Sequence, residues 1–333
     1  MTRLGLVGAG LVGRRHVAAI EAVPGVSLVG VVEPNRDTAL DLPWVDDLDD
    51  LLPLCDGVIL AVPNDQHAPM ALRCIAATKP VLIEKPLAGS SEDGARIVDA
   101  AGDCPVLVGH HRRHMPLVAE AGRLIAEGAL GRLTTLHAQC WLPKPDRYFQ
   151  QAWRTGKGAG PLFINLIHDV DLLMNLCGPI TRVQAMESGA IRDNGAEDTM
   201  VVAACFADGL LGTLNLSDAA VGPWSWEMTA HENPSYPATD QTCYWIGGTA
   251  GSLALPNLAH WSQPEGPDWW APISATRMPV ARIDPLQAQI AHFADVIAGR
   301  AAPLVTTEDG LRALRVVEAI KSSAETGHGV DLA

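Results

Sequence analysis

The sequence lacks three features that mark large classes of protein: a long apolar run, paired cysteines and an excess of positive charge. No stretch approaches the roughly eighteen uninterrupted apolar residues of a transmembrane helix. The first strand is expected to begin by Arg3, which leaves no room for a removable signal peptide. Lysine and arginine number 24 against 38 aspartates and glutamates, and the net charge of −14 disfavours nucleic acids and anionic membranes as partners.

The seven cysteines are widely scattered and form no CxxC pair. An odd number at such spacing predicts reduced, mostly buried thiols and argues against a disulfide framework or a zinc site. The histidines are also spread out, so no metal site is expected. Together these absences predict a cytoplasmic protein.

What the sequence does contain is a dinucleotide-binding pattern at its head. The apolar run Arg3–Val7 is followed at once by Gly8-Ala-Gly-Leu-Val-Gly13, and apolar residues at helical spacing continue to Ala22. A second apolar strand, Val26–Val32, ends at Glu33. A glycine pattern alone is weak evidence. Placed between a strand and a helix, with an acid closing the next strand, it favours a Rossmann fold over another glycine-rich turn.

Each residue of this pattern has an expected role. Gly8 permits the tight turn, Gly10 lets the backbone approach the pyrophosphate, and Gly13 allows close packing of helix on strand. The Glu33 carboxylate can accept hydrogen bonds from both ribose hydroxyls, and its charge would repel a 2′-phosphate. Because Arg36 lies nearby and could support NADP, the pattern favours NAD without excluding NADP.

The first third of the chain has an alternating rhythm of strands and helices. Strand-like runs at 57–61, 81–83 and 106–108 alternate with helical stretches at 69–77 and 92–101. This βαβ order predicts a parallel-sheet Rossmann domain over residues 1–116.

Beyond residue 116 the pattern changes to strands followed by grouped helices. Residues 158–177 contain a long apolar helix, 180–217 alternate like strands, and amphipathic helices are expected at 285–298 and 306–325. This order predicts an α+β domain over residues 117–333 with a large, mostly antiparallel sheet. Six of the nine tryptophans lie between positions 224 and 270. Core and sheet packing is the favoured interpretation, and a sheet face buried against another subunit is the alternative.

Two loops at strand ends carry polar side chains where ligands bind in open α/β folds. In Val62-Pro-Asn-Asp-Gln-His67, Asn64 could hold a carboxamide, and His67 could line the pocket or simply begin a helix. Val81-Leu-Ile-Glu-Lys-Pro86 ends a strand with an acid and a lysine. A charged amine there is costly unless it is paired or its pKa falls, and a lysine of lowered pKa is a usable general base. The plainer alternative is a surface salt bridge.

In order and spacing, the motifs GAGLVG, AVPNDQH and IEKP resemble the Gfo/Idh/MocA oxidoreductase family. Further segments extend the resemblance over nearly the whole chain: 109–116 is similar to the family's exit from the nucleotide domain, 153–154 to its WR motif, and 158–168 to its glycine-rich helix entry. The resemblance implies a Rossmann domain joined to an open-faced antiparallel sheet. In the family such sheets commonly pair subunits into homodimers or homotetramers.

The resemblance also implies the roles of site residues. Lys85 would lie beside the nicotinamide and move the hydroxyl proton, with Glu84 and Pro86 positioning it, and His168 matches the family's catalytic histidine. The cofactor contacts expected from the motifs and the resemblance together are Gly8, Gly10, Leu11, Val12, Gly13, Glu33, Arg36, Pro63, Asn64, His67, Glu84, Lys85, Pro86, Arg113, Trp153 and Arg154.

One position departs from the family pattern. Family dehydrogenases of sugars and cyclitols often carry an aspartate four residues before this histidine, where the chain has Ile164. Asn165 can share a helix face with His168 and hydrogen-bond a substrate hydroxyl or the imidazole, but an amide cannot act as acid or base. The expected catalytic set is therefore Lys85 and His168, with Asn165 as a positioning group. Asp171 could sit beneath the site, although a solvated helix carboxylate is the default.

The expected function is NAD(P)-dependent hydride transfer at a CH–OH group of a small sugar, cyclitol or related polyol. One alternative is an NAD-dependent glycosidase that oxidises its substrate only transiently. A second is a dehydrogenase of a dihydrodiol, hydroxy acid or imine, which the missing aspartate at 164 keeps open. A third is a non-catalytic nucleotide sensor, against which the intact Glu84-Lys85-Pro86 set argues.

Overall fold

The computed structural model describes residues 1–37, 40–151, 154–156 and 158–332, and the chain divides into two compact units. Unit 1 comprises residues 1–115 and 283–314, and unit 2 comprises 116–282 and 315–333. The sequence-based division at residue 116 differs from this one in the C-terminal region, because residues 283–314 belong to unit 1. Helix α9 (Thr307–Thr326) begins in unit 1 and ends in unit 2.

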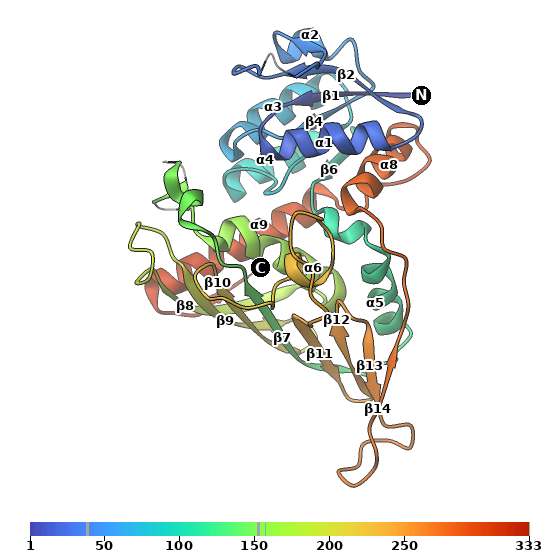
Figure 1. Cartoon of the computed structure of the whole chain (residues 1–333), viewed down its shortest axis with the longest axis vertical. Helices are drawn as coiled ribbons and strands as arrows, with labels where there is room; N and C mark the ends of the chain where they lie inside the picture. Colours follow the sequence, from blue (N-terminus) through green and yellow to red (C-terminus); the bar gives the residue numbers. More distant parts are fainter. Residues whose placement is uncertain (38–39, 152–153, 157, 333) are drawn as a thin grey trace. The chain divides into compact units, whose positions relative to one another are not determined.

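Unit 1 is built on a six-stranded sheet in the order β3-β2-β1-β4-β5-β6, and every pairing in it is parallel (Figure 1). This is the strand order of a doubly wound dinucleotide-binding sheet, so the predicted Rossmann fold is confirmed. The central strands are short apolar runs because both of their faces are buried. The strands are β1 (Thr2–Val7), β2 (Val26–Val32), β3 (Trp44–Val45), β4 (Gly57–Leu60), β5 (Val81–Ile83) and β6 (Val106–Val108).

Helices pack against both faces of this sheet. On one face, Leu6 of β1 shares a core with Ile20 of α1 and Phe293 of α8. On the other face, Val58 of β4 shares a core with Ile97 of α4. The helices of unit 1 besides the start of α9 are α1 (Leu11–Ala22), α2 (Leu48–Leu51), α3 (Asn64–Ala76), α4 (Ser91–Ala101), the 3₁₀ helix η1 (His111–His114) and α8 (Pro285–Ile297).

Unit 2 is built on a nine-stranded sheet in the order β14-β13-β12-β11-β7-β10-β9-β8-β15 (Figure 1). All its pairings are antiparallel except β7 with β10, which confirms the large, mostly antiparallel sheet. The strands are β7 (Leu133–Trp141), β8 (Ile180–Ser188), β9 (Thr199–Phe206), β10 (Leu211–Ser217), β11 (Tyr244–Gly248), β12 (Gly251–Leu255), β13 (Ala259–Ser262), β14 (Ser274–Arg277) and β15 (Val330–Asp331).

One face of the unit 2 sheet is covered and the other is open. Strand residues alternate between buried and exposed, as in β7, where Leu136 and Ala138 are buried beside the exposed His137. Helices cover the buried side: Ser323 of α9 accepts a hydrogen bond from the Ala185 amide of β8 at 3.0 Å. Besides α9, unit 2 contains the helical elements α5 (Pro116–Ala126), η2 (Asp146–Gln150), the π-helix η4 (Leu162–Leu166), α6 (Ile167–Cys177) and α7 (Trp226–Thr229) among its described residues.

The tryptophans of unit 2 divide between the two interpretations made from the sequence. Trp226 is fully buried, whereas Trp245 and Trp261 are 39% and 41% exposed on strands of the open face. Trp269 and Trp270 are 95% and 90% exposed, so core packing is wrong for this pair. Within the described residues, no helix combines the length and apolar character needed to cross a membrane.

Candidate active site

The glycine-rich turn of unit 1 has the geometry of a nucleotide cradle. Gly8 has a φ of +93°, and a Cβ there would lie 2.3 Å from the carbonyl oxygen of Ala61. A Cβ on Gly13 would lie 2.0 Å from the Gly8 carbonyl oxygen, so α1 can pack this closely only with glycine. A Cβ on Gly10 would meet no atom within 4 Å, which leaves open space where α1 begins. This open helix N-terminus fits a pyrophosphate.

Glu33 is held at the end of β2 beside this turn. Its Oε2 accepts a hydrogen bond from the Ala9 amide and its Oε1 from the Asn35 amide, both at 2.9 Å. Arg36, which could have supported a 2′-phosphate, donates to Asp46 at 2.5 Å and to the Val45 carbonyl oxygen at 2.8 Å. Glu33 is therefore held beside the turn while Arg36 is engaged by Asp46 and Val45, which fits the ribose of NAD.

The Glu84 carboxylate, directly after β5, is buried and bonded on both oxygens. Its Oε1 lies 2.7 Å from Nε2 of the fully buried His16, and its Oε2 accepts the Lys85 amide at 3.1 Å. Burial alone would raise the pKa of this carboxyl, but the hydrogen bond from His16 and the nearby positive charges outweigh burial and lower the pKa to about 2. Glu84 is thus ionised and fixes the backbone of the neighbouring lysine.

A second histidine braces the other end of the Glu84-Lys85-Pro86 tripeptide. The ring of His67, in the first turn of α3, is buried with Nδ1 2.7 Å from the Pro86 carbonyl oxygen and Nε2 3.0 Å from that of Val62. Burial lowers the pKa of His67, so the neutral ring carries one N–H and donates to one of the two oxygens. His67 therefore joins the loop after β4 to the loop after β5.

The remaining predicted cofactor contacts of unit 1 differ in exposure. Leu11, Val12, Pro63 and Asn64 have exposed side chains that a ligand could reach. The Arg113 guanidinium is largely buried and lies 3.1 Å from the Asp309 carboxylate. Arg113 therefore serves the packing of α9 on η1 within unit 1.

In unit 2 the predicted catalytic residues lie where a π-helical turn passes into an α-helix. Asn165 belongs to η4 and His168 to α6, and both are buried, at 9% and 8% exposure. A π turn closes with i→i+5 bonds, so Asn165 does not follow the regular α-helical spacing assumed from the sequence. Such turns are frequent at functional sites.

The carboxylates that follow His168 are buried. The expectation that the Asp171 carboxylate is exposed to solvent is therefore wrong. Asp169 and Asp171 are both 1% exposed. The hydroxyl of Tyr244, on β11, donates a hydrogen bond to Asp169 Oδ1 and ties the sheet to α6. The apolar residues around these acids place most of α6 in the core, and Asp169 and Asp171 are buried because they belong to the same helix.

The predicted WR motif is only partly described, because Trp153 lies outside the described residues. The Arg154 guanidinium stacks over the Tyr148 ring, 4.1 Å from its centroid, and donates to the Tyr148 carbonyl oxygen at 3.2 Å. Arg154 is thereby fixed within unit 2.

Three residues of these arrangements were missed in the sequence. The burial of His16 could have been predicted, because it lies with Gly13 and Ile20 on the buried side of α1, where a titratable side chain needs a partner. The contacts of Glu227 and Tyr244 could not, since they meet Asn165 and Asp169 across 62 and 75 residues of chain.

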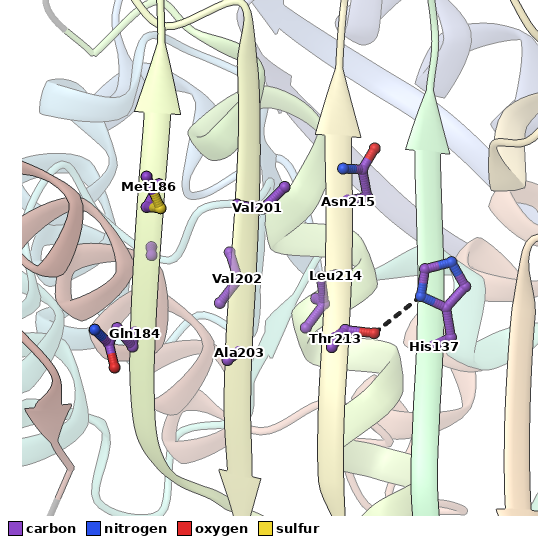
Figure 2. Close-up of a pocket in the computed structure, with 10 residues that line it drawn as sticks. His137, Gln184, Met186, Val201, Val202, Ala203, Thr213, Leu214 and Asn215 are labelled. Atoms are coloured by element: carbon purple, nitrogen blue, oxygen red, sulfur yellow. Dashed lines mark hydrogen bonds between the residues drawn. The ribbon is translucent and has the colours of Figure 1, made fainter.

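A hollow of about 430 Å³ lies on the open face of the unit 2 sheet, and none of the residues predicted to be catalytic lines it. Figure 2 shows side chains of four neighbouring strands along it, with Met186 on β8, Val201 on β9 and Asn215 on β10. The His137 ring on β7 lies beside Thr213, with Nδ1 2.9 Å from Oγ1 (Figure 2). The hollow is broad and open, which fits a surface that another molecule covers better than a reaction chamber.

Comparison with known proteins assigns both units to one family. Residues 2–110 match the oxidoreductase family with an NAD-binding Rossmann fold (GFO_IDH_MocA), and residues 118–254 match the GFO/IDH/MocA C-terminal domain. Inositol 2-dehydrogenase 4 of Saccharopolyspora erythraea is 33% identical over 235 residues, covering 64% of this chain and 66% of that protein. The 1,5-anhydro-D-fructose reductase of Ensifer adhaerens is 26% identical, covering 100% of this chain and 99% of that protein.

A solved structure shows the same fold over its full length. An NAD-binding oxidoreductase from Klebsiella pneumoniae superimposes with a TM-score of 0.84 at 19% identity, covering 100% of this chain and 99% of that one. At this identity the likeness concerns the fold alone.

Proposed function

The chain belongs to the Gfo/Idh/MocA family of NAD-dependent oxidoreductases, and on that premise we propose that it oxidises a CH–OH group of a sugar, cyclitol or related polyol. The names of similar proteins support this substrate class, since one is an inositol dehydrogenase and another a reductase of an anhydro-sugar. The observation that carries the proposal is the braced Glu84-Lys85-Pro86 tripeptide, in which an ionised, buried carboxylate and a buried histidine fix the lysine's backbone.

In the proposed reaction the Lys85 Nζ takes the hydroxyl proton of the substrate, either directly or through the imidazole of His168. Asn165 holds a substrate hydroxyl through its side-chain amide, which can hydrogen-bond but cannot transfer a proton. Bound NAD supplies the acceptor for the hydride that leaves the carbon. The protein supplies orientation and the movement of the proton.

We assign binding of this cofactor to the groups that surround the head of α1. The open turn at Gly10 would take the pyrophosphate and the Glu33 carboxylate the ribose hydroxyls. The exposed Pro63 and Asn64 would meet the nicotinamide end. We assign His67 and Glu84, both buried behind the loops, to positioning.

Substitution of Lys85 by alanine tests the reaction. Turnover, followed as NAD reduction with a panel of polyols, should fall by about 10²- to 10⁴-fold, the usual contribution of a positioned acid–base group. The NAD-induced thermal shift should persist, because the glycine turn is untouched.

A matched control is Lys79→Ala in the same unit, where the ammonium donates to the Cys55 carbonyl oxygen at 2.6 Å. This variant should lose stability but keep turnover per folded molecule. A Lys85→Ala protein that retained most of its turnover would contradict the assignment of Lys85 as the group that takes the hydroxyl proton. Release of product without accumulation of reduced cofactor would point instead to transient oxidation and a hydrolytic reaction.

We also propose that the open face of the unit 2 sheet joins copies of this chain into a homodimer, or two such pairs into a homotetramer. The face carries partly exposed large apolar side chains on five strands: Met186, Val201, Leu211, Trp245 and Trp261. Exposed apolar side chains on one sheet face, with aromatic residues among them, are typical of subunit interfaces.

A further inference from the structure

The carboxylate that family dehydrogenases often carry four residues before the catalytic histidine is absent at Ile164, but unit 2 contains another carboxylate at the same turn. Glu227, on the short helix α7, is buried at 6% exposure. The side-chain amide of Asn165 donates to its Oε1 at 3.4 Å. The residue that follows Ile164 in the chain is therefore in contact with an acid supplied by a different element.

Packing holds Glu227 in this place. Its neighbour Trp226 is fully buried and stacks on the Tyr244 ring, with centroids 5.1 Å apart and planes at 30°. Tyr244 in turn donates to Asp169 in α6, the helix that carries His168. The Ser225 hydroxyl caps α7 by accepting the Met228 amide at 3.3 Å. The backbone on either side of Glu227 is thus fixed relative to α6.

The side-chain amide of Asn165, which binds Glu227 through its nitrogen, has a second hydrogen-bonding atom, the oxygen Oδ1. Asn165 is 9% exposed, and its Oδ1 has no hydrogen-bond partner among the described residues. Exchange of its oxygen and nitrogen would bring two acceptors together, so the orientation is set by the Glu227 carboxylate. A buried acceptor left without a donor is costly, and a ligand that brings a hydroxyl removes the cost.

We propose that Glu227 and Asn165 together bind adjacent hydroxyl groups of the substrate, with Glu227 replacing the carboxylate missing at 164. An ionised carboxylate only accepts hydrogen bonds, and Asn165 Oδ1 is also an acceptor. Two neighbouring acceptors match two O–H donors on neighbouring carbons, which selects vicinal diols over hydroxy acids or imines. This assignment rests on the proposed polyol dehydrogenase function and narrows its substrate to compounds with a free diol.

The test compares the wild type with Glu227→Gln, which keeps the shape and removes the charge. In the presence of NAD, we expect the thermal shift produced by a polyol such as myo-inositol to be lost, with affinity and kcat/KM falling on the order of 10- to 100-fold. The shift produced by NAD alone should be unchanged. Asp198→Asn is the matched control, because that buried carboxylate accepts the Ile191 and Arg192 amides at 2.8 and 3.0 Å. It should lower stability but keep the polyol response.

A rescue experiment separates substrate binding from a structural role. Adding Ile164→Asp to Glu227→Gln returns a carboxylate to the same turn. The double variant should bind the polyol at least tenfold more tightly than Glu227→Gln alone. A Glu227→Gln protein that binds polyols as the wild type does would overturn this inference and leave the proposed function intact. A wild type that responds to no polyol, in binding or in NAD reduction, would overturn both.

Discussion

His16 and Glu84 form a buried ionisable pair next to Lys85. His16 is fully buried, Glu84 is 8% exposed, and their side chains meet at 2.7 Å. Removing one partner of such a pair leaves an uncompensated buried charge, which costs far more than an exposed ion pair is worth. Because Glu84 also binds the Lys85 amide, the pair couples the stability of unit 1 to the position of the lysine.

We therefore expect His16→Ala to lower the free energy of unfolding by about 3 kcal/mol near neutral pH. In the wild type, the Glu84 pKa of about 2 lies below the ordinary 4.5, so its stabilisation is complete above pH 4.5 and is lost towards pH 2. Without His16 the pKa rises and protonation relieves the buried charge, so the deficit should shrink as the pH falls. Urea unfolding across this range measures the difference.

The exposed His328 provides the control, since His328→Ala should leave the unfolding free energy near neutral pH within error. Equal stability of His16→Ala and the wild type near neutrality would contradict the assignment of Glu84 as a charged, His16-dependent group.

At this scale the local geometry of the glycine-rich turn could be predicted from the sequence better than the surroundings of Asn165 and His168. The tight turn at Gly8, the close packing at Gly13 and the place of Glu33 at the end of β2 could be predicted because local backbone geometry within one βαβ unit fixes them. The burial of Asp171 and the contact of Glu227 with Asn165 depend on packing between distant segments, which no local pattern encodes.

At the scale of elements, η1 packs against α8 through two histidines. The rings of His114 and His292 lie edge to face, with centroids 5.2 Å apart. Burial, and then the charge of His292, lower the His114 pKa from 6.5 to about 3. The folded protein therefore holds this ring neutral over a range in which the unfolded chain would protonate it.

The consequence is a loss of stability in acid. Below pH 6.5 the unfolded chain binds a proton at His114, whereas the folded protein binds it only near pH 3. The free energy of unfolding therefore decreases as the pH is lowered from 6.5 to 3. The slope from this one group is at most about 1.4 kcal/mol per pH unit. His114→Phe keeps the aromatic contact, removes the titration and should flatten the acid limb of chemical unfolding curves. His328→Gln, in an exposed position, should not, and an unchanged slope in His114→Phe would refute the role of this ring.

Elements with strong periodicity were predicted closely. The helix expected from Leu11 to Ala22 has these bounds in the structure, and the one expected at 306–325 spans Thr307–Thr326. The parallel pairing of β7 with β10 inside an antiparallel sheet was not predicted. Strand order depends on contacts between distant segments, such as that between His137 and Thr213, which are 76 residues apart in the chain. The π turn at 162–166 was likewise invisible in an apolar sequence that favours any helix.

For the molecule as a whole, the open face of the unit 2 sheet decides whether the chain acts alone. Val201 and Leu211 are 45% and 60% exposed on adjacent strands of that face. Val201→Glu combined with Leu211→Glu places two charges where a partner copy would bury them, and should convert the proposed oligomer to monomers in sedimentation experiments. Circular dichroism and the NAD-induced thermal shift should stay as in the wild type.

Leu304→Glu, an exposed apolar position of unit 1 at 44% exposure, is the control and should leave the mass unchanged. A double variant that kept the mass of the wild-type oligomer would place the interface elsewhere, and a wild type that sedimented as a monomer would remove the proposal.

Unit 1 is assembled from two separate segments of the chain, residues 1–115 and 283–314, and this has a consequence during synthesis. The first 115 residues leave the ribosome early, but Leu286, Ile290 and Phe293, which complete one face of their sheet beside Leu4 and Ile59, are translated only after almost all of unit 2. The nascent Rossmann sheet must therefore wait with one apolar face covered only in part, by α1, while some 170 residues emerge. The unit begun first therefore depends on a segment made after residue 282, so a ribosome that stalls within residues 116–282 would leave a chaperone substrate rather than a finished nucleotide-binding unit.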